Sequence, residues 1–457
     1  IYLYDANNIS IEGNTDITFT ENVGKRFESY NWHVVGPVDG MNVDQVDRAL
    51  NEARLETQRP SLIIARTTIG YGSPNKANTG GVHGSPLGTE EVAFTRENLQ
   101  WEYPPFEIPS DVKLHMQQAI RNGKCLQKKW IDLLESYHSK YPEDALSFTS
   151  DLKGEINQAL FNDMERLFSN DTKPIATREA GGRVMNYIAE YLHSLTGGSA
   201  DLAPSNNTLL KNHKHIGSSL DAHNMHFGVR EHAMGSIAGG LALHGGFIPY
   251  TATFLIFSDY MRPPMRLAAL MGLRVIYVFT HDSIALGEDG PTHQPVEQLI
   301  GLRAIPNMTV IRPADAIETS YAWKASLMNE SGPTAIVLTR QGVPILDQSQ
   351  YLPANGLLKG GYILWEHSHK PDVILIATGS EVHLALEAAK AASHENCSVR
   401  VVSLPSWEIF QQQSVQYQDE VLPPSVTARI SIEAGSTLGW SKYVGPSGIS
   451  IGVDTFG

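Results

Sequence analysis

The feature that most constrains the fold of this chain is an alternation of short β-branched runs with helical segments, which recurs in three stretches. In the first stretch, strand-like runs at 32–40 and 60–70 flank a segment whose apolar residues recur at helical spacing. Asn42 and Gln45 stand at the start of that segment as a capping pair would. Strands that alternate with helices form largely parallel sheets covered on both faces. The sequence therefore predicts an α/β protein.

The second stretch, from about 150 to 345, is the most regular, and a third begins near 360. Strands of the second stretch are predicted at 247–254, 273–281, 308–315 and 333–340. Between about 76 and 150 the pattern dissolves into proline, glycine, tryptophan and scattered helix, as in a long connecting segment. We therefore predict three consecutive α/β units with mainly parallel sheets. Their bounds are 1–145 (including the connecting segment), 146–350 and 351–457.

Composition excludes several classes of protein. The net charge of −14 argues against a nucleic-acid-binding surface. No apolar run reaches the roughly 18 residues of a membrane span. Cys125 and Cys397 are too few and too far apart for a disulfide framework, which fits a reducing cytosol and predicts a cytoplasmic protein. The chain opens without methionine in a strand already under way and closes just after another strand-like run, so we expect a fragment.

The stretch THDSIALGEDGPTHQP, residues 280–295, leaves the carboxyl end of a predicted strand. It carries two histidines and three acids between glycines and a proline: His281, Asp282, Glu288, Asp289 and His293. For any one of these residues a solvated turn is the simpler interpretation. In open α/β sheets, however, ligands bind where the carboxyl ends of strands meet loops. The loop is therefore a candidate binding site.

The run HFGVREHAMGSIAGGLALHGG predicts a helix that starts at Glu231. The carboxylate of Glu231 would stabilise the positive end of the helix dipole, or it would be a buried group that hydrogen-bonds a basic ring nitrogen. Position in the sequence leaves both interpretations open. The helix is expected to bury an apolar stripe of Ala233, Ile237 and Leu241 and to pack closely at Gly235, Gly239 and Gly240.

Three further groups of residues could carry chemistry. In TATFLIFSDY the aromatic side chains Phe254, Phe257 and Tyr260 recur at spacing three, which fits either a core stripe or a stacking wall for a flat heterocycle. DANNISIEG, residues 5–13, offers amide and backbone oxygens that suit a hard cation, although it is first of all a turn. Four single residues could together read a phosphate and a polyol: His83, Arg178, Ser205 and Arg340.

Five of these runs, GEDGPTHQPVEQL, GVREHAMG, GGSADLAPSN, YTATFLIFSDY and GSPNKANTGGVHGSPLG, resemble transketolase, and the resemblance extends from Ile1 to Gly457. It implies the thiamine-diphosphate-binding fold, with that cofactor and a divalent cation (Mg²⁺, or Ca²⁺ or Mn²⁺) bound at the interface of a homodimer. It also implies transfer of a two-carbon ketol group from a ketose phosphate to an aldose phosphate, through a cofactor carbanion, in the pentose phosphate pathway. The three units would then be the end of the diphosphate-binding domain, the pyrimidine-binding domain and an incomplete C-terminal domain.

The resemblance also implies roles for cofactor-binding residues. Glu231 resembles the glutamate that hydrogen-bonds the aminopyrimidine ring and favours its imino form, whose nitrogen removes the thiazolium C2 proton. Phe257 resembles the ring that packs on the aminopyrimidine, with Phe254 and Tyr260 completing the pocket. The metal ligands would be the side chain of Asn7 and the backbone carbonyl of Ile9.

Substrate contacts follow from the same resemblance. His83 stands where the family has a histidine near both the diphosphate and the substrate. His281, Asp289 and His293 resemble contacts to sugar hydroxyls, and His293 would assist proton transfer at the donor carbonyl. Arg178, Ser205 and Arg340 resemble the grip on the sugar phosphate. Asp282 is interpreted as a turn residue and Glu288 as a solvated flank.

The chain departs from the family pattern at its ends. The family's first domain opens with a long segment, including a Gly-Asp-Gly turn that supplies a metal-binding aspartate, which does not occur here. DANN stands where DDNG-like text is commoner. Two alternatives therefore stay open: a related enzyme such as a dihydroxyacetone synthase or a deoxyxylulose-phosphate synthase, or a non-catalytic chain that dimerises with a complete paralogue. The second would be expected to have lost Glu231 or the substrate histidines, which are present.

Overall fold

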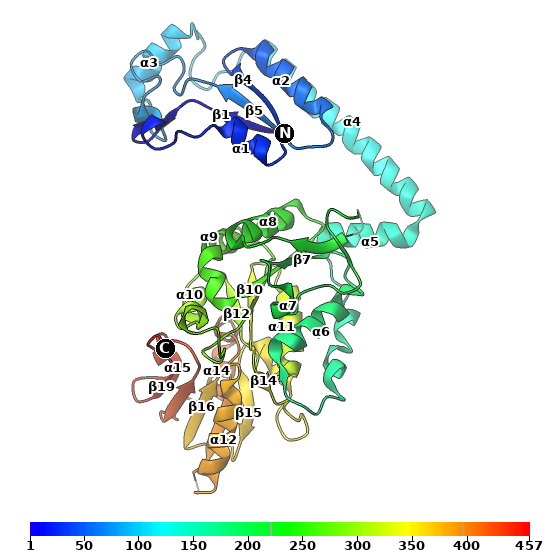
Figure 1. The fold of residues 1–457 in the computed structure, drawn as a ribbon, viewed down its shortest axis with the longest axis vertical. Coiled ribbons are helices and arrows are strands. Elements are labelled where there is room, and N and C mark those ends of the chain that lie inside the picture. Colours follow the sequence, from blue (N-terminus) through cyan, green and yellow to red (C-terminus); the bar gives the residue numbers. More distant parts are fainter. Residues whose placement is uncertain (220–221, 396) are drawn as a thin grey trace. The chain divides into compact units, whose positions relative to one another are not determined.

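The computed structural model describes residues 1–219, 222–395 and 397–457. The chain forms two compact units, Ile1–Ile131 and Asp132–Gly457, each with its own sheets (Figure 1). Among the described residues, no helix is both long enough and apolar enough to cross a membrane. The predicted fold class, α/β with mainly parallel sheets, is confirmed in both units.

The first unit is built on a parallel sheet with the order β1 (Tyr2–Asp5), β5 (Ser61–Arg66), β4 (His33–Asp39). Helix α2 (Val43–Leu55) packs on this sheet through its buried alanines. Its N-terminus is capped by Asn42, whose side chain accepts a hydrogen bond from the Gln45 N–H at 3.1 Å. The Gln45 side chain accepts from the backbone N–H of Asp39 at 3.0 Å, so it fastens the end of β4 to the helix. The remaining short elements are α1 (Val23–Ser29), β2 (Ile9–Ser10), β3 (Gly13–Asn14) and α3 (Thr89–Asn98).

The connecting segment contains one long helix, so the prediction of scattered helix was wrong. Helix α4 (Ser110–Lys140) runs for 31 residues and is followed by α5 (Pro142–Lys153). None of the α4 side chains is buried, and the middle of the helix contains Gly123, although glycine is unfavourable inside a helix. These two features explain why the pattern looked broken.

The second unit has a seven-stranded parallel sheet at its centre. The strand order is β12 (Thr309–Ile311), β13 (Thr334–Leu338), β11 (Ile276–Thr280), β10 (Ile248–Phe254), β7 (Leu195–Ser199), β9 (Ala222–His226) and β8 (Lys214–His215). Helices α6 (Thr177–Ala189) and α11 (Ala316–Met328) cover one face. Helices α8 (Glu231–His244), α9 (Ser258–Leu270) and α10 (Gln298–Arg303) cover the other (Figure 1). Strand β12 is shorter than predicted because Asp315 already caps α11, accepting from the Glu318 N–H at 2.8 Å.

Helix α8 begins at Glu231 as predicted, but it buries a different face. Its buried residues are Glu231, Met234, Gly235 and Ala238, whereas Ile237 of the expected stripe is 44% exposed. A Cβ on Gly235 would lie 2.7 Å from the Met261 side chain on α9, while one on Gly240 would meet open space. The helix is apolar on several sides, so the sequence pattern could not show which side packs on α9.

A second sheet follows in the same unit, with the order β15 (Tyr362–Glu366), β17 (Val399–Ser403), β16 (Val373–Ala377), β18 (Arg429–Ile432) and β19 (Ile449–Ile451). Edge strand β15 is antiparallel to β17, and the other pairs are parallel. Helix α12 (Glu381–Ser393) covers one face. The short helices α13 (Trp407–Gln411), α14 (Val415–Val421) and α15 (Ser441–Val444) lie on the other.

Candidate active site

The predicted site residues of the second unit come from loops and helices at the carboxyl ends of neighbouring strands. Ser205 lies in α7 (Ala203–Asn206) after β7, Phe254 closes β10, His281 follows β11 and Arg340 follows β13. These four strands are adjacent in the sheet, in the order β13-β11-β10-β7. The topology therefore brings together residues that are far apart in the sequence.

An aromatic cluster forms the centre of the site. The rings of Phe254 and Phe257 are stacked with centroids 5.9 Å apart, and Phe254 also stacks on His281 at 3.7 Å. The rings of His293 and Phe257 are nearly perpendicular with centroids 5.4 Å apart, and the Tyr260 ring extends the cluster with its centroid 6.1 Å from that of Phe257. Phe254 is buried, whereas Phe257 is half-buried and Tyr260 is 64% exposed. The cluster thus has one ring in the core and two that present a surface.

The hydrogen bonds around His281 determine which of its ring nitrogens carries the proton. The Thr280 hydroxyl donates its one hydrogen to the Asn206 side-chain oxygen at 2.8 Å. The His281 Nδ1 lies 2.9 Å from the same hydroxyl and must therefore be the donor. Burial, reinforced by the positive charge of Arg178, lowers the pKa of His281 to about 4. At neutral pH the imidazole is therefore uncharged and its Nε2 is a hydrogen-bond acceptor.

Glu231 is the first residue of α8, and only 8% of it is exposed. The helix dipole favours a negative charge at this end. The hydroxyl of Thr253 on β10 donates to its Oε1 over a long distance of 3.5 Å. The carboxylate is thus held close to the aromatic strand end while retaining capacity to accept a stronger hydrogen bond.

Two arginines lie at the edge of the site. Arg178 lies in the first turn of α6 and donates to the backbone carbonyl of Ser205 at 2.7 Å, so Ser205 contacts it through its main chain. Burial and the nearby charge of Arg340 lower the pKa of Arg178. Both arginines line a cavity of about 710 Å³, together with Arg183 and Lys211. Glu179 also lines the cavity and pairs with Arg183 at 3.1 Å, so the charge of the wall is positive in sum.

Two acids of the loop after β11 have partners that their sequence neighbours did not reveal. Glu288, interpreted as a solvated flank, is exposed but pairs with Arg340 at 2.9 Å. Asp282, interpreted as a turn residue, is 1% exposed and pairs with the fully buried Arg312 at 2.8 Å. Both interpretations were incomplete because the partners lie on other strand ends. Asp289 and His293 are half-buried in the same loop, which turns at Gly290 with a φ of +72°.

The first unit holds the other predicted residues. The Asn7 side-chain oxygen accepts a hydrogen bond from the Ile9 N–H at 2.9 Å, in a turn that leads into the β2–β3 hairpin. The turn that ends at His83 packs on this hairpin, since a Cβ on Gly80 would lie 2.8 Å from the Ile11 carbonyl oxygen. His83 itself is exposed. Among the described residues, no three His, Cys, Asp or Glu side chains are grouped to hold a metal ion.

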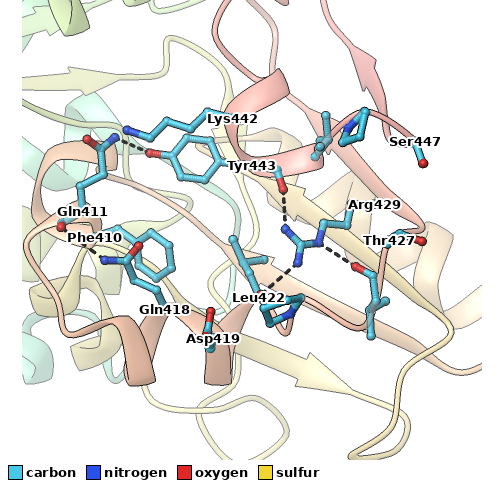
Figure 2. A pocket seen from close by; sticks show the side chains of 15 residues that line it. Phe410, Gln411, Gln418, Asp419, Leu422, Thr427, Arg429, Lys442, Tyr443 and Ser447 are labelled. Carbon is cyan, nitrogen blue, oxygen red and sulfur yellow. Dashed lines mark hydrogen bonds between the residues drawn. The ribbon is translucent and has the colours of Figure 1, made fainter.

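A cavity of about 380 Å³ in the C-terminal part of the chain contains none of the predicted site residues (Figure 2). The guanidinium of Arg429 lies in its wall and donates to four backbone carbonyls, those of Leu422, Pro423, Val426 and Tyr443. Such bonds satisfy the polar groups of turns. Arg429 therefore holds the surrounding loops together.

Sequence reasoning missed Thr280, Asn206 and Thr253, which orient His281 and Glu231. All three occur inside runs that were singled out for other residues. A signal was available for Thr280 alone, because a hydroxyl directly before a candidate histidine at a strand end can set its tautomer. The other two partners depend on contacts across the sheet.

Three family models match the chain in order. The transketolase thiamine diphosphate binding domain matches residues 1–157, the transketolase pyrimidine binding domain matches 173–345, and the transketolase-like C-terminal domain matches 360–457. A chloroplastic transketolase of Craterostigma plantagineum is 48% identical over 462 residues, covering 100% of this chain and 88% of the relative. The transketolase of Bacillus subtilis is 47% identical over 461 residues, covering 100% of this chain and 69% of the relative.

Solved structures agree with the sequence relatives. Transketolase from Leishmania mexicana superposes with a TM-score of 0.93 at 38% identity, covering 100% of this chain and 67% of that one. Transketolase from Campylobacter jejuni superposes with a TM-score of 0.87 at 36% identity, covering 100% and 68%. Because all three domain models match in order and the similarity spans the whole chain, this chain belongs to the transketolase family.

Proposed function

We propose that this protein transfers a two-carbon ketol group from a ketose phosphate to an aldose phosphate, with thiamine diphosphate as its cofactor, in the pentose phosphate pathway. The observation that carries the proposal is the cluster of Phe254, Phe257, His281 and His293, whose electrostatic neighbours include Arg178 and Arg340. An aromatic wall suits a flat heterocycle, histidines suit sugar hydroxyls and arginines suit a phosphate. When bound, thiamine diphosphate supplies a carbon nucleophile and an electron sink.

The residues of the second unit fit the pyrimidine half of that cofactor. Phe257 offers a half-buried ring face beside Phe254, with Tyr260 at its edge. Glu231 accepts a proton or a hydrogen bond from the ring nitrogen, and its near-complete burial strengthens that bond. Its task is to hold a proton at the pyrimidine during turnover.

The two histidines and Asp289 bind the sugar. His281 accepts a hydrogen bond from a hydroxyl at Nε2, because Thr280 occupies its Nδ1. Asp289 accepts from a second hydroxyl, and His293 assists proton transfer at the donor carbonyl. Holding the sugar by several hydroxyls fixes the carbonyl for attack, which lowers the entropic part of the barrier.

Arg178 and Arg340 hold the sugar phosphate at the positive wall of the 710 Å³ cavity. Burial lowers the pKa of Arg178, and repulsion by the positive charge of Arg340 lowers it further. A phosphate dianion between them removes this repulsion, so binding is stabilised beyond a single ion pair. Ser205 supports the grip through its carbonyl, and Glu288 is the exposed counter-ion that substrate displaces from Arg340.

The first unit supplies His83 and the metal ligands. The Asn7 amide oxygen and the Ile9 carbonyl are neutral oxygen donors, which suit Mg²⁺, Ca²⁺ or Mn²⁺. Two such donors do not complete the coordination of a hard cation, so cofactor phosphate oxygens, water and other protein oxygens would supply the rest. His83 would contact the diphosphate of the cofactor and the substrate.

A homodimer, with active sites at its interface, belongs to the same proposal. Large apolar side chains of α8 and α9 are uncovered within the second unit, among them Ile237 at 44% and Leu270 at 69% exposed. Exposed large apolar side chains that gather on one face mark a protein interface. The division into domains 1–145, 146–350 and 351–457 and a cytoplasmic location are also proposed. Both cysteines are free thiols, as expected in a reducing compartment.

Glu231→Gln tests the function directly. We expect a loss of turnover of about 100-fold or more, with an unchanged melting temperature, when ketol transfer between sugar phosphates is followed in the presence of thiamine diphosphate and Mg²⁺. Glu387→Gln, on the exposed side of α12, is the matched control and should behave as wild type. Near-normal turnover of the Glu231 variant would remove Glu231 from the mechanism. Preferential use of pyruvate as donor would favour the deoxyxylulose-phosphate synthase alternative.

A further inference from the structure

His281 has a backbone conformation that needs support. Its φ is +59°, in the left-handed region that residues with a Cβ seldom adopt. Its side chain is almost fully buried against Phe254. A conformation of this kind persists only where the surrounding structure imposes it. The neighbouring residue, Asp282, provides the support for this conformation.

Asp282 is tied down by a buried ion pair. Its Oδ2 accepts from the Nε of Arg312 at 2.9 Å and lies 2.8 Å from the Nη2 of the same guanidinium. Arg312 directly follows β12 and is fully buried. A buried carboxylate without a cation is strongly unfavourable. Arg312 therefore fixes the place where the chain leaves β11.

Arg312 is held in turn by the C-terminal sheet. Its Nη1 donates to the backbone oxygen of Thr378 at 3.0 Å and to the hydroxyl of the same residue at 3.1 Å, and it pairs with the carboxylate of Glu381. A Cβ on Gly379 would lie 2.5 Å from the guanidinium carbon, so the strand end needs glycine there to let the arginine approach. The arginine thus bridges two sheets.

Further charges anchor the far side of this bridge. Glu433 accepts from the Thr378 hydroxyl at 2.6 Å and from both terminal nitrogens of Arg303 at 2.7 Å. The Glu381 Oε2 that meets Arg312 also accepts from the Ala434 N–H at 2.9 Å. The group holds three carboxylates and two guanidiniums. Arg312 joins Asp282 to Glu381, whose carboxylate is also held by a backbone N–H, and Glu433 joins Arg303 to Thr378.

We propose that Arg312 is a positioning residue for sugar recognition, which couples the C-terminal domain to His281 through Asp282. On this view the C-terminal domain sets the direction in which the imidazole Nε2 points into the site. The inference rests on the proposed function, because it takes His281 as a substrate contact. It adds that Thr378, Glu381 and Arg312, none of which is a predicted sugar contact, determine how well the donor is held.

A double-mutant cycle tests this coupling. Asp282→Asn keeps the shape of the side chain and removes its charge, and we expect it to raise the KM for the ketose phosphate donor about tenfold, with a smaller effect on kcat. In a His281→Ala background the same substitution should change the donor KM by less than about twofold, because its effect passes through His281. Equal effects in both backgrounds would overturn the proposal.

Two further variants separate positioning from stability. Glu381→Gln disturbs the same bridge from the C-terminal side and should raise the donor KM in the same direction, so the proposal can be tested even if Asp282→Asn fails to fold. Glu366→Gln breaks another largely buried ion pair of the same domain, the one with Arg400 at 2.7 Å. It should leave the donor KM unchanged, even if it lowers the melting temperature. If Glu366→Gln raised the donor KM as much as Glu381→Gln does, the effect of Glu381→Gln would be explained by general destabilisation.

The single variant His281→Ala separates the proposed substrate contact of His281 from the proposed positioning role of Arg312. If it leaves the donor KM unchanged, His281 is not a substrate contact and the proposed function of this residue fails. If His281→Ala raises the donor KM while Asp282→Asn and Glu381→Gln do not, the substrate contact stands and the positioning role of Arg312 is refuted.

Discussion

Replacing Glu433 by glutamine should destabilise the protein by about 3 kcal/mol at neutral pH. The carboxylate is 2% exposed and accepts four hydrogen bonds, two from Arg303 at 2.7 Å, one from Thr378 at 2.6 Å and one from the Trp440 indole at 3.0 Å. Glutamine keeps the shape but removes the charge, and in either orientation its NH₂ group faces a donor of Arg303. The variant therefore leaves a buried guanidinium without its counter-charge.

The pKa of Glu433 gives an independent magnitude. Burial acts to raise it, but Arg303 and Arg312 outweigh burial and lower the pKa from 4.5 to about 2. Since one pKa unit corresponds to about 1.4 kcal/mol, the ionised form contributes about 3 kcal/mol. This agrees with the range of about 3–5 kcal/mol for removing one partner of a buried pair.

The pH dependence has a definite sign. A carboxyl group whose pKa is lower in the folded state stabilises the fold fully above its unfolded value of 4.5, and this stabilisation is lost as pH falls toward 2. Wild type and Glu433→Gln should therefore differ most at pH 7 and converge in acid. An unchanged difference between pH 7 and pH 3 would contradict this assignment of the charge.

Urea unfolding followed by tryptophan fluorescence is a suitable assay, because two tryptophans report on this group. The guanidinium of Arg303 lies 4.0 Å from the Trp407 ring centroid, and Trp440 donates to Glu433. Glu387→Gln, exposed on α12, serves as the control. A Glu433→Gln variant within about 1 kcal/mol of wild type at pH 7 would refute the reasoning, since that is the value of an exposed pair.

Three further predictions can be checked with simple variants. Gly235→Ala should cost about 1–3 kcal/mol in urea unfolding, because its Cβ would lie 2.7 Å from Met261; Gly240→Ala, which meets open space on the same helix, should be neutral or stabilising, and equal losses would contradict the packing argument. Arg340→Ala should raise the KM of phosphorylated sugars at least about tenfold more than that of unphosphorylated ones, measured in paired assays; equal effects would reject the phosphate role. Because the pKa of His281 is lowered to about 4, His281 stays uncharged above pH 5. Any acid limb above pH 5 in the pH profile of the donor kcat/KM should therefore persist in His281→Ala, and its disappearance would contradict the lowered pKa.

Much of the candidate site could be proposed from the sequence because the relevant signals are local. The strand that ends at Phe254 and the loop that carries His281 and His293 are each one continuous run. Parallel strands place their carboxyl ends at one edge of the sheet, so the gathering of these runs follows from the fold class. The helix start at Glu231 was also predicted correctly.

Other features could not be predicted because they depend on partners distant in the chain. Asp282 was interpreted as a turn residue because Arg312 lies 30 positions away, and Glu288 as solvated because Arg340 lies 52 positions away. The buried side of α8 was assigned to Ile237, since an apolar helix does not reveal in its sequence which side meets α9.

The sequence by itself determined the α/β class, the succession of strands and helices, and the set of side chains available for chemistry, because periodicity and composition act over a few residues. Only the tertiary structure decided that His281 is neutral with a free Nε2 and that Arg312 joins two sheets. Burial and charge pairing depend on atoms within a few ångströms in space. Those neighbours come from strand ends that are tens of residues apart, so they are defined only once the sheets have formed.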